Sequence, residues 1–232
     1  NRITEGPWHV ERVVKVDEAA RTVYFVANGR EAGENPYYEH FYKVNVDGSG
    51  LKQLTHGEFF HDVELDDDAR FFVDNYSRAN TVPCADLLDN NGKKVMTIQE
   101  SDFSSLKAAG YKFPEPFKVK AADGVTDLYG VMYKPFDFDS TKKYPIISCV
   151  YPGPQTDNVP LIFGVGSTNE ALAQIGCIVV AFNHRGGIPF RGRAYHSFGY
   201  NNIRDHALAD DKCGLEQLIK RHPYIDGNKV GI

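Results

Sequence analysis

The sequence contains an internal repeat that limits the folds open to its first hundred residues. The segment Asp17–Arg21 aligns with Asp66–Arg70 at an offset of 49 residues, and Val16 then falls on Leu65. Each copy holds four short segments of strand-forming residues, separated by turn sequences such as Asp47–Gly50. Four-stranded units that recur about every 40 to 50 residues are typical of β-propeller blades. The repeat predicts two such blades, with an ordinary antiparallel sandwich as the alternative.

The two repeat copies contain eight predicted strands. They are His9–Val16, Thr22–Ala27, His40–Val46, Lys52–Thr55, His61–Leu65, Arg70–Tyr76, Ala85–Leu88 and Lys94–Gln99. Two blades cannot close a propeller ring, which needs about four or more. We therefore expect a longer parent protein that begins earlier and supplies further blades.

The pattern of apolar residues changes after Glu100. Ser101–Ala109 predicts a short helix, and Pro114 prevents its continuation. We expect one domain over residues 1–112 and a second over residues 113–232.

The second domain is predicted to be an α/β domain, because predicted strands alternate with predicted helices. Tyr144–Tyr151 and Cys177–Asn183 are nearly continuous apolar runs, which are typical of strands buried on both faces. The other predicted elements are strands at Phe117–Ala121, Leu128–Lys134 and Lys229–Ile232 and helices at Thr168–Ile175 and His206–Arg221. The sheet is expected to be truncated, since the chain stops in the last of these strands.

Charge and hydropathy argue against two classes of partner. The formal net charge is −5 and no run of Lys and Arg exceeds two residues, so binding to nucleic-acid phosphates is not expected. The longest apolar stretches, such as Ile175–Phe182, are far shorter than the roughly 20 residues of a membrane-spanning helix. We predict neither a nucleic-acid partner nor a membrane span in this chain.

Cysteine and histidine spacings give no support to a metal site. Cys84, Cys149, Cys177 and Cys213 form no CxxC pair, and the eight histidines show neither HxH nor HExxH spacing. We expect buried free thiols at the cysteines, surface or loop positions for the histidines, and no metal or cofactor.

Three segments of the second domain, taken together and in order, carry a family signature. They are Leu128–Pro135 (LYGVMYKP), Val150–Gln155 (VYPGPQ), and His184–Gly187 (HRGG) running on to Arg191–Ala194 (RGRA). These segments resemble the prolyl oligopeptidase clan of serine peptidases, most closely its dipeptidyl peptidase IV branch. The resemblance implies the last two blades of a β-propeller over residues 1–112, followed by the first half of an α/β-hydrolase domain over residues 113–232.

The resemblance also implies what the parent protein does. It would be a serine exopeptidase that releases N-terminal di- or tripeptides after proline or alanine, without a cofactor, as a periplasmic or extracellular homodimer. In this family a Gly-x-Ser-x-Gly nucleophile elbow follows the strand that ends here at Ile232. No such motif occurs among the 232 residues. The chain is therefore predicted to lack the Ser/Asp/His triad and to be inactive alone.

Two alternative functions stay open. The first is an acylaminoacyl peptidase or oligopeptidase of the same clan, because these enzymes share the hydrolase motifs. The second is a non-catalytic binding or scaffold protein of the propeller type. Two departures from the family pattern favour it: Pro152, where the family usually has a small residue, and Asn183, where it commonly has aspartate.

Tyr151 is the one catalytic residue that the resemblance implies within this chain. In the family, the tyrosine of the Tyr-x-Gly-Pro segment points its phenol at the carbonyl oxygen under attack. A preorganised donor about 3 Å from the developing oxyanion contributes roughly 2.7 to 4 kcal/mol. Tyr151 is therefore expected to be the oxyanion donor.

Four other polar residues are expected to serve structure. Arg185 is predicted to brace the loop near the elbow rather than to touch substrate, and Asp211 to brace its helix or face solvent. Glu39 and His40 could form an acid–base pair, but packing within a strand explains them better.

Overall fold

The computed structural model describes residues 2–151 and 156–232, which fall into two compact units. The units consist of residues 1–102 with 190–192, and of residues 103–189 with 193–232. In this division, segment 103–112 belongs to the second unit. The predicted domain boundary after residue 112 stays a prediction.

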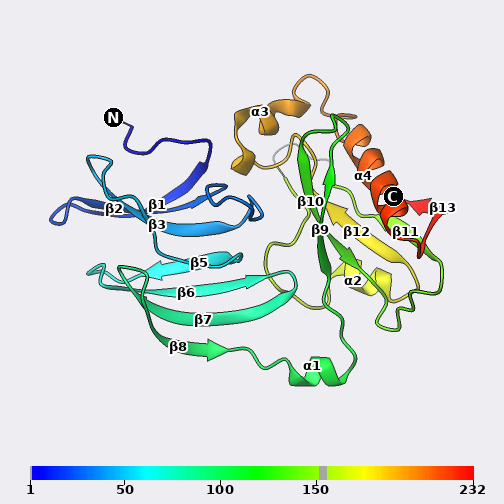
Figure 1. Cartoon of the computed structure of the whole chain (residues 1–232), viewed down its shortest axis with the longest axis horizontal. Helices are drawn as coiled ribbons and strands as arrows, with labels where there is room; N and C mark the ends of the chain where they lie inside the picture. Colours follow the sequence, from blue (N-terminus) through cyan, green and yellow to red (C-terminus); the bar gives the residue numbers. More distant parts are fainter. Residues whose placement is uncertain (1, 152–155) are drawn as a thin grey trace. The chain divides into compact units, whose positions relative to one another are not determined.

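The first unit consists of two four-stranded antiparallel sheets (Figure 1). The first sheet holds β1 (His9–Asp17), β2 (Thr22–Asn28), β3 (Glu39–Asn45) and β4 (Lys52–Gln53), and the second holds β5 (Phe60–Leu65), β6 (Phe71–Arg78), β7 (Thr81–Asp89) and β8 (Lys94–Glu100). In each sheet the strands pair in chain order. Short turns dictate this order, because a hairpin places consecutive strands side by side. The predicted pair of four-stranded units is confirmed.

The two sheets repeat in the same register. Val16 pairs with Val23 in the first hairpin, and Leu65 pairs with Phe72 at the equivalent place 49 residues later. In each turn, the first aspartate of the repeated motif accepts a hydrogen bond from a backbone amide three or four residues on. The sequence repeat is therefore also a repeat of hairpin geometry.

An apolar layer holds the two sheets face to face. It contains the buried residues Tyr24, Val26, Phe41, Leu54, Val63, Ala69, Phe72 and Leu88. The rings of Phe41 and Phe72, one from each sheet, meet edge to face with centroids 5.0 Å apart. This geometry adds to the stabilisation that burial alone provides. Sheets stacked in this way are the building plan of a β-propeller.

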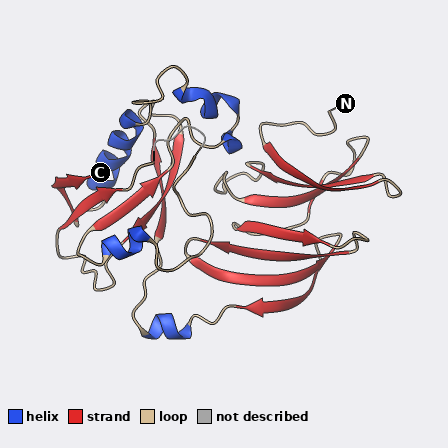
Figure 2. Cartoon of the chain, turned by 180° about the vertical axis from the view of Figure 1, so that it is seen from behind, coloured by secondary structure: helices blue, strands red, loops and turns tan. Residues whose placement is uncertain are grey.

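The second unit contains a five-stranded mixed sheet in the order β13-β11-β12-β10-β9. Its strands are β9 (Glu115–Lys120), β10 (Asp127–Tyr133), β11 (Tyr144–Ser148), β12 (Ile178–Phe182) and β13 (Ile225–Gly231). Strand β11 is parallel to β12 and β13, whereas β10 is antiparallel to β9 and β12. Parallel neighbours need crossover connections, and helices supply them here (Figure 2). The predicted α/β character of this part is confirmed.

Burial of the two central parallel strands differs. All five residues of β12 are buried, as the apolar run predicts. In β11, Ile146 is fully buried but Ile147 is only half-buried. Ile147 lies beside Val179, on the opposite side of the sheet from the core cluster that contains Ile146. The helix α2 packs mainly on β10 and β12, so it covers this side of β11 less completely.

The α-helices of the described chain all belong to the second unit. They are α1 (Ser104–Ala108), α2 (Thr168–Ala173), α3 (Arg193–His196) and α4 (Leu208–Arg221). Helix α2 starts where Ser167 Oγ accepts the amide of Glu170 at 3.1 Å, while the Glu170 carboxylate accepts the amide of Gly166. Helix α3 was not predicted, because Gly186 and Gly192 interrupt the apolar pattern on its N-terminal side.

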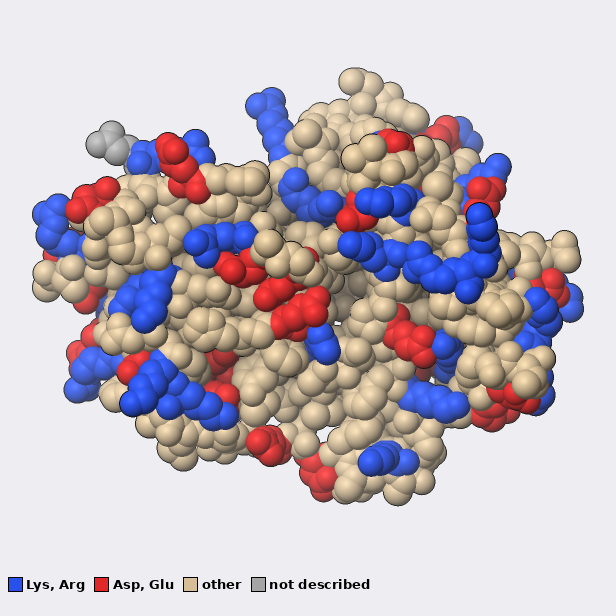
Figure 3. All heavy atoms as spheres, viewed as in Figure 1, with Lys and Arg blue, Asp and Glu red and all other residues tan. Residues whose placement is uncertain are grey.

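The surface carries both signs of charge. On the face shown in Figure 3, acidic and basic side chains occur together over the sheets of each unit. None of the helices in the described residues is both long and apolar enough to span a bilayer.

Gly130 lies in β10 at a point where the sheet leaves no room for a side chain. A Cβ atom there would lie 2.5 Å from Phe117 Cζ and Phe182 Cβ and 2.7 Å from Ala181 O. We expect Gly130→Ala to lower the free energy of unfolding by about 1–3 kcal/mol, because neighbouring strands must shift. Urea unfolding followed by circular dichroism at 222 nm tests this. Gly164→Ala is the matched control, since nothing lies within 4 Å of a Cβ there.

Candidate functional site

The carboxyl ends of β11 and β12 lie at one edge of the sheet, because the two strands are parallel neighbours. Tyr151 follows β11 and is 58% exposed, while Arg185 follows β12. Ligands of open α/β sheets bind outside this edge, which makes it the candidate site. The role of Tyr151 as oxyanion donor stays a prediction. Pro152 lies outside the described residues.

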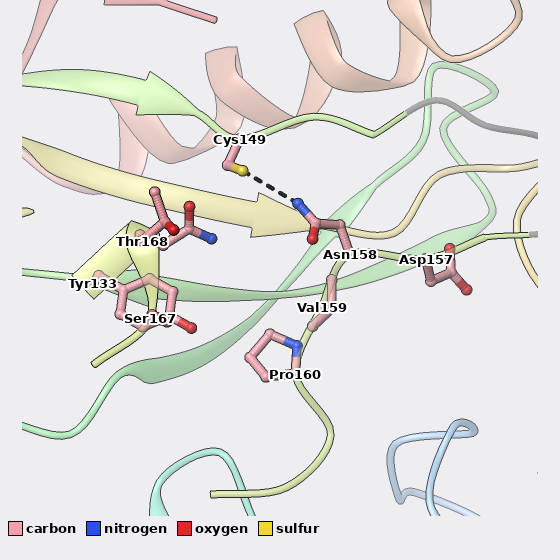
Figure 4. Close-up of a pocket in the computed structure, with 9 residues that line it drawn as sticks. Tyr133, Cys149, Asp157, Asn158, Val159, Pro160, Ser167 and Thr168 are labelled. Carbon is pink, nitrogen blue, oxygen red and sulfur yellow. Dashed lines mark hydrogen bonds between the residues drawn. The ribbon is translucent and has the colours of Figure 1, made fainter. Parts of the chain in front are cut away.

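A pocket of about 540 Å³ opens next to the end of β11 (Figure 4). Its walls are Tyr133 at the end of β10, Cys149, the segment 157–160, and residues 167–169 at the start of α2. Asn158 Nδ2 donates a hydrogen bond to Cys149 Sγ at 3.2 Å, shown by the dashed line in Figure 4. The pocket therefore borders both flanks of the segment that contains Tyr151.

Arg185 is bound by carboxylates from two other segments. Its Nε and Nη2 donate to the two oxygens of Asp210 at 2.9 and 2.7 Å, and its Nη1 donates to Asp123 at 3.0 Å. Asp210 is fully buried and also accepts the amide of Ala122 at 2.9 Å. The guanidinium lies over the ring of Phe198, 4.0 Å from its centroid. Arg185 therefore braces its loop as predicted, with each guanidinium nitrogen engaged.

The surroundings favour the charged forms of Arg185 and Asp123. Hydrogen bonding to Asp210 raises the pKa of Arg185, and hydrogen bonds from Thr126 lower the pKa of Asp123. Asp210 lies in the first turn of α4, where the helix dipole favours a negative charge. Arg185, Asp123 and Asp210 thus form an ionic clamp that joins the loop after β12 to the β9–β10 turn and to α4.

Asp211 follows Asp210 but has a different environment. Its side chain is 6% exposed, so it does not face solvent. Burial, and then the neighbouring Asp210 charge, raise the pKa of Asp211 to about 7. A protonated Asp211 is therefore well populated near neutral pH.

The Asp211 carboxyl makes stability depend on pH. Its pKa is raised above the ordinary value, so the folded state keeps a proton that the unfolded state loses. The stability associated with this group is fully present below about pH 4 and is lost as pH rises to about 7. We expect Asp211→Asn to become more stable than the wild type over that range, by up to about 4 kcal/mol. Urea unfolding at a series of pH values measures it, with exposed Glu216→Gln as the control.

Four of the eight histidines are buried rather than at the surface, although two of these four, His184 and His206, do lie in loops as predicted. His40, His61, His184 and His206 are all buried. The rings of His184 and His206 lie 5.4 Å apart, and burial followed by the His206 charge lowers the pKa of His184 to about 4. His206 fits closely between two glycine backbones, where an added Cβ would come within 3 Å of its ring. These side chains pack in the interior, and local sequence spacing carries no signal of that role.

Glu39 and His40 do not form an acid–base pair. Nε2 of His40 bonds instead to the carboxylate of Glu34 at 2.8 Å, and its Nδ1 lies 3.2 Å from Thr55 Oγ1. Adjacent strand residues point to opposite faces of the sheet, which separates the two groups. Burial raises the pKa of Glu39 to about 7. Strand packing explains both residues.

The four cysteines are free and half-buried rather than fully buried. Within residues 2–151 and 156–232, no three histidine, cysteine or acidic side chains are grouped closely enough to hold a metal ion.

Comparison with known proteins shows which families the two parts of the chain resemble. Residues 1–83 match the N-terminal region of dipeptidyl peptidase IV, and residues 164–232 match the prolyl oligopeptidase family. Two separate parts of the chain are therefore similar to two regions of this kind of peptidase. Human dipeptidyl peptidase 8 is 32% identical to it over 248 aligned residues, which cover 99% of this chain.

Two solved structures have a fold similar to that of the whole chain. A Bacteroides ovatus protein assigned as a dipeptidyl aminopeptidase IV superposes with a TM-score of 0.82 at 26% identity, and covers 100% of this chain. Porphyromonas gingivalis dipeptidyl peptidase 4 gives a TM-score of 0.79 at 25% identity, also over 100% of the chain. The chain spans 26% of the length of the human relative and 32% of each solved chain.

Sequence reasoning missed Asp123 and Asp210, the two carboxylates that hold Arg185. Asp123 belongs to an Asp-Gly turn and Asp210 to an acidic pair at the start of a predicted helix, and both patterns have ordinary structural explanations. The acidic pair was a usable signal, but it could not indicate which of its two members binds Arg185.

Proposed function

We propose that the whole protein carrying this chain is a serine exopeptidase that removes N-terminal di- or tripeptides, after proline or alanine. The main support is that 99% of the chain aligns with a human dipeptidyl peptidase. Further support comes from the two family matches, which fall in different units. The substrates are peptides, and the working form is a homodimer.

In this proposal the chain supplies part of the catalytic machinery. A serine beyond Ile232, activated by histidine and aspartate, attacks the peptide carbonyl and forms an acyl-enzyme. Tyr151 and a backbone amide donate hydrogen bonds to the oxyanion. Residues 1–112, as propeller blades, filter access, while residues 113–232 belong to the hydrolase domain. The chain alone is inactive, because none of its residues completes the triad.

Hydrolysis of Gly-Pro-p-nitroanilide tests the proposal. We expect the whole protein to cleave this substrate and the 232-residue chain alone to leave it intact. An N-blocked analogue should be a poor substrate, because an exopeptidase of this kind needs the free amine. Preference for the blocked substrate would favour an acylaminoacyl peptidase or oligopeptidase instead. Absence of cleavage by the whole protein would favour a binding or scaffold role.

A further inference from the structure

The loop after β12 contacts the segment that follows Tyr151. The Gly187 backbone lies against the Asp157 side chain so closely that an added Cβ would fall 2.2 Å from Asp157 Oδ1 and 2.9 Å from its Cγ. The same carboxylate accepts the amide of Ile188 at 3.3 Å. The Asp157 side chain therefore packs against the backbone of residue 187 at a distance that only a glycine there allows.

That segment is also tied to the strand that precedes Tyr151. Asn158, next to Asp157, donates its side-chain hydrogen bond to Cys149 Sγ at 3.2 Å. Cys149 in turn donates its backbone amide to Val180 of β12 at 2.7 Å. Figure 4 shows Asn158 facing Cys149. Chain segments on both sides of Tyr151 are thus attached to β12 or to the loop that follows it.

Tyr151 itself has few contacts of its own. It is 58% exposed, so the surrounding described residues cover less than half of it. Because the Tyr151 side chain is largely exposed, the position of its hydroxyl depends on how the backbone at residue 151 is held. The anchors available are the Cys149 side of the loop and the Asp157 side.

We propose that Arg185 and Gly187 are positioning residues for Tyr151. The clamp of Arg185 on Asp210 and Asp123 fixes the loop after β12. Gly187 in that loop seats Asp157, and the hydrogen bond from the neighbouring Asn158 to Cys149 passes that restraint to the residues just before Tyr151. This inference rests on the proposed function, because it assigns the oxyanion to Tyr151. A misplacement of about 1 Å at a reacting group can cost about 100-fold in rate.

Gly187→Ala in the whole protein is the direct test. The methyl group must displace Asp157, and we expect kcat for Gly-Pro-p-nitroanilide to fall about 10- to 100-fold with little change in KM. Gly164→Ala makes the same substitution in open space and should leave kcat unchanged. Arg185→Lys keeps the charge but loses the two-pronged bond to Asp210, and should also lower kcat.

Two double variants separate positioning from a general structural defect. In a Tyr151→Phe background, Gly187→Ala should cause little further loss, because the group that it positions is already gone. Asp157→Ala removes the atoms that the new methyl group would strike, so Asp157→Ala/Gly187→Ala should be no slower than Asp157→Ala alone. Equal losses from Gly187→Ala with and without the Tyr151 hydroxyl would overturn the inference.

Amide hydrogen exchange provides a readout that does not need catalysis. In the whole protein, Gly187→Ala should speed exchange over residues 148–151 and 156–159, and Gly164→Ala should not. Unchanged exchange in Gly187→Ala would contradict the positioning role. If the wild-type protein cleaves no peptide, the proposed function fails, and exchange still decides whether Gly187 sets the Tyr151 segment.

Discussion

Replacing Tyr151 with phenylalanine should lower kcat of the whole protein about 100- to 1,000-fold, which is the usual cost of removing one oxyanion donor. The substitution deletes only the hydroxyl group. Because the side chain is 58% exposed, the fold should not change. KM should move little, since the lost hydrogen bond strengthens only in the transition state.

Steady-state hydrolysis of Gly-Pro-p-nitroanilide measures this effect. Tyr200→Phe is a suitable control, because Tyr200 is a 54% exposed tyrosine of the same unit. A kcat within about two-fold of wild type for Tyr151→Phe would remove Tyr151 from the mechanism and leave the oxyanion to other donors.

Replacing Asp210 with alanine should destabilise the second unit by about 3–5 kcal/mol, because it leaves a largely buried guanidinium without its main partner. The Arg185 side chain is only 15% exposed and that of Asp210 is fully buried. The amide of Ala122 loses its acceptor as well. This is the largest loss of stability that we expect from a single polar substitution in this unit.

The chain offers separate spectroscopic signals for its two units. Its α-helices all belong to the second unit, so circular dichroism at 222 nm follows that unit during urea unfolding. The single tryptophan, Trp8, packs against Phe25 and Tyr42 in the first unit, so its fluorescence follows the first. Asp210→Ala should lower the urea midpoint measured by circular dichroism, which follows the second unit, and should leave the midpoint measured by tryptophan fluorescence unchanged.

A matched surface variant shows whether the effect is specific. Asp205 is 63% exposed and lies 3.7 Å from Arg204 at the surface, so Asp205→Ala should cost no more than about 1 kcal/mol. If Asp210→Ala cost as little as Asp205→Ala, the ionic clamp around Arg185 would not be a stabilising element.

Much of the fold could be predicted because its signals are local. Alternation of apolar residues and Asp/Asn/Gly turns predicted all eight strands of the first unit, although β7 begins four residues before its predicted start at Ala85. The 49-residue offset predicted the matching hairpin registers. The continuous apolar run of β12 correctly indicated a fully buried strand. Helix α3 escaped prediction, since it is four residues long and follows a glycine-rich segment.

The strands, the two repeated sheets, the α/β character of the second unit and the family resemblance can be predicted from the sequence, because each depends on residues close together in the chain or on ordered motifs. The folded structure was needed to show that Asp210 rather than Asp211 binds Arg185, 25 residues away, and that four histidines are buried. It also brought Gly187 against Asp157, at a separation that only a glycine allows. Such contacts depend on the packing of segments that are distant in the chain. The local sequence therefore does not show which of two adjacent residues, such as Asp210 and Asp211, will make the contact.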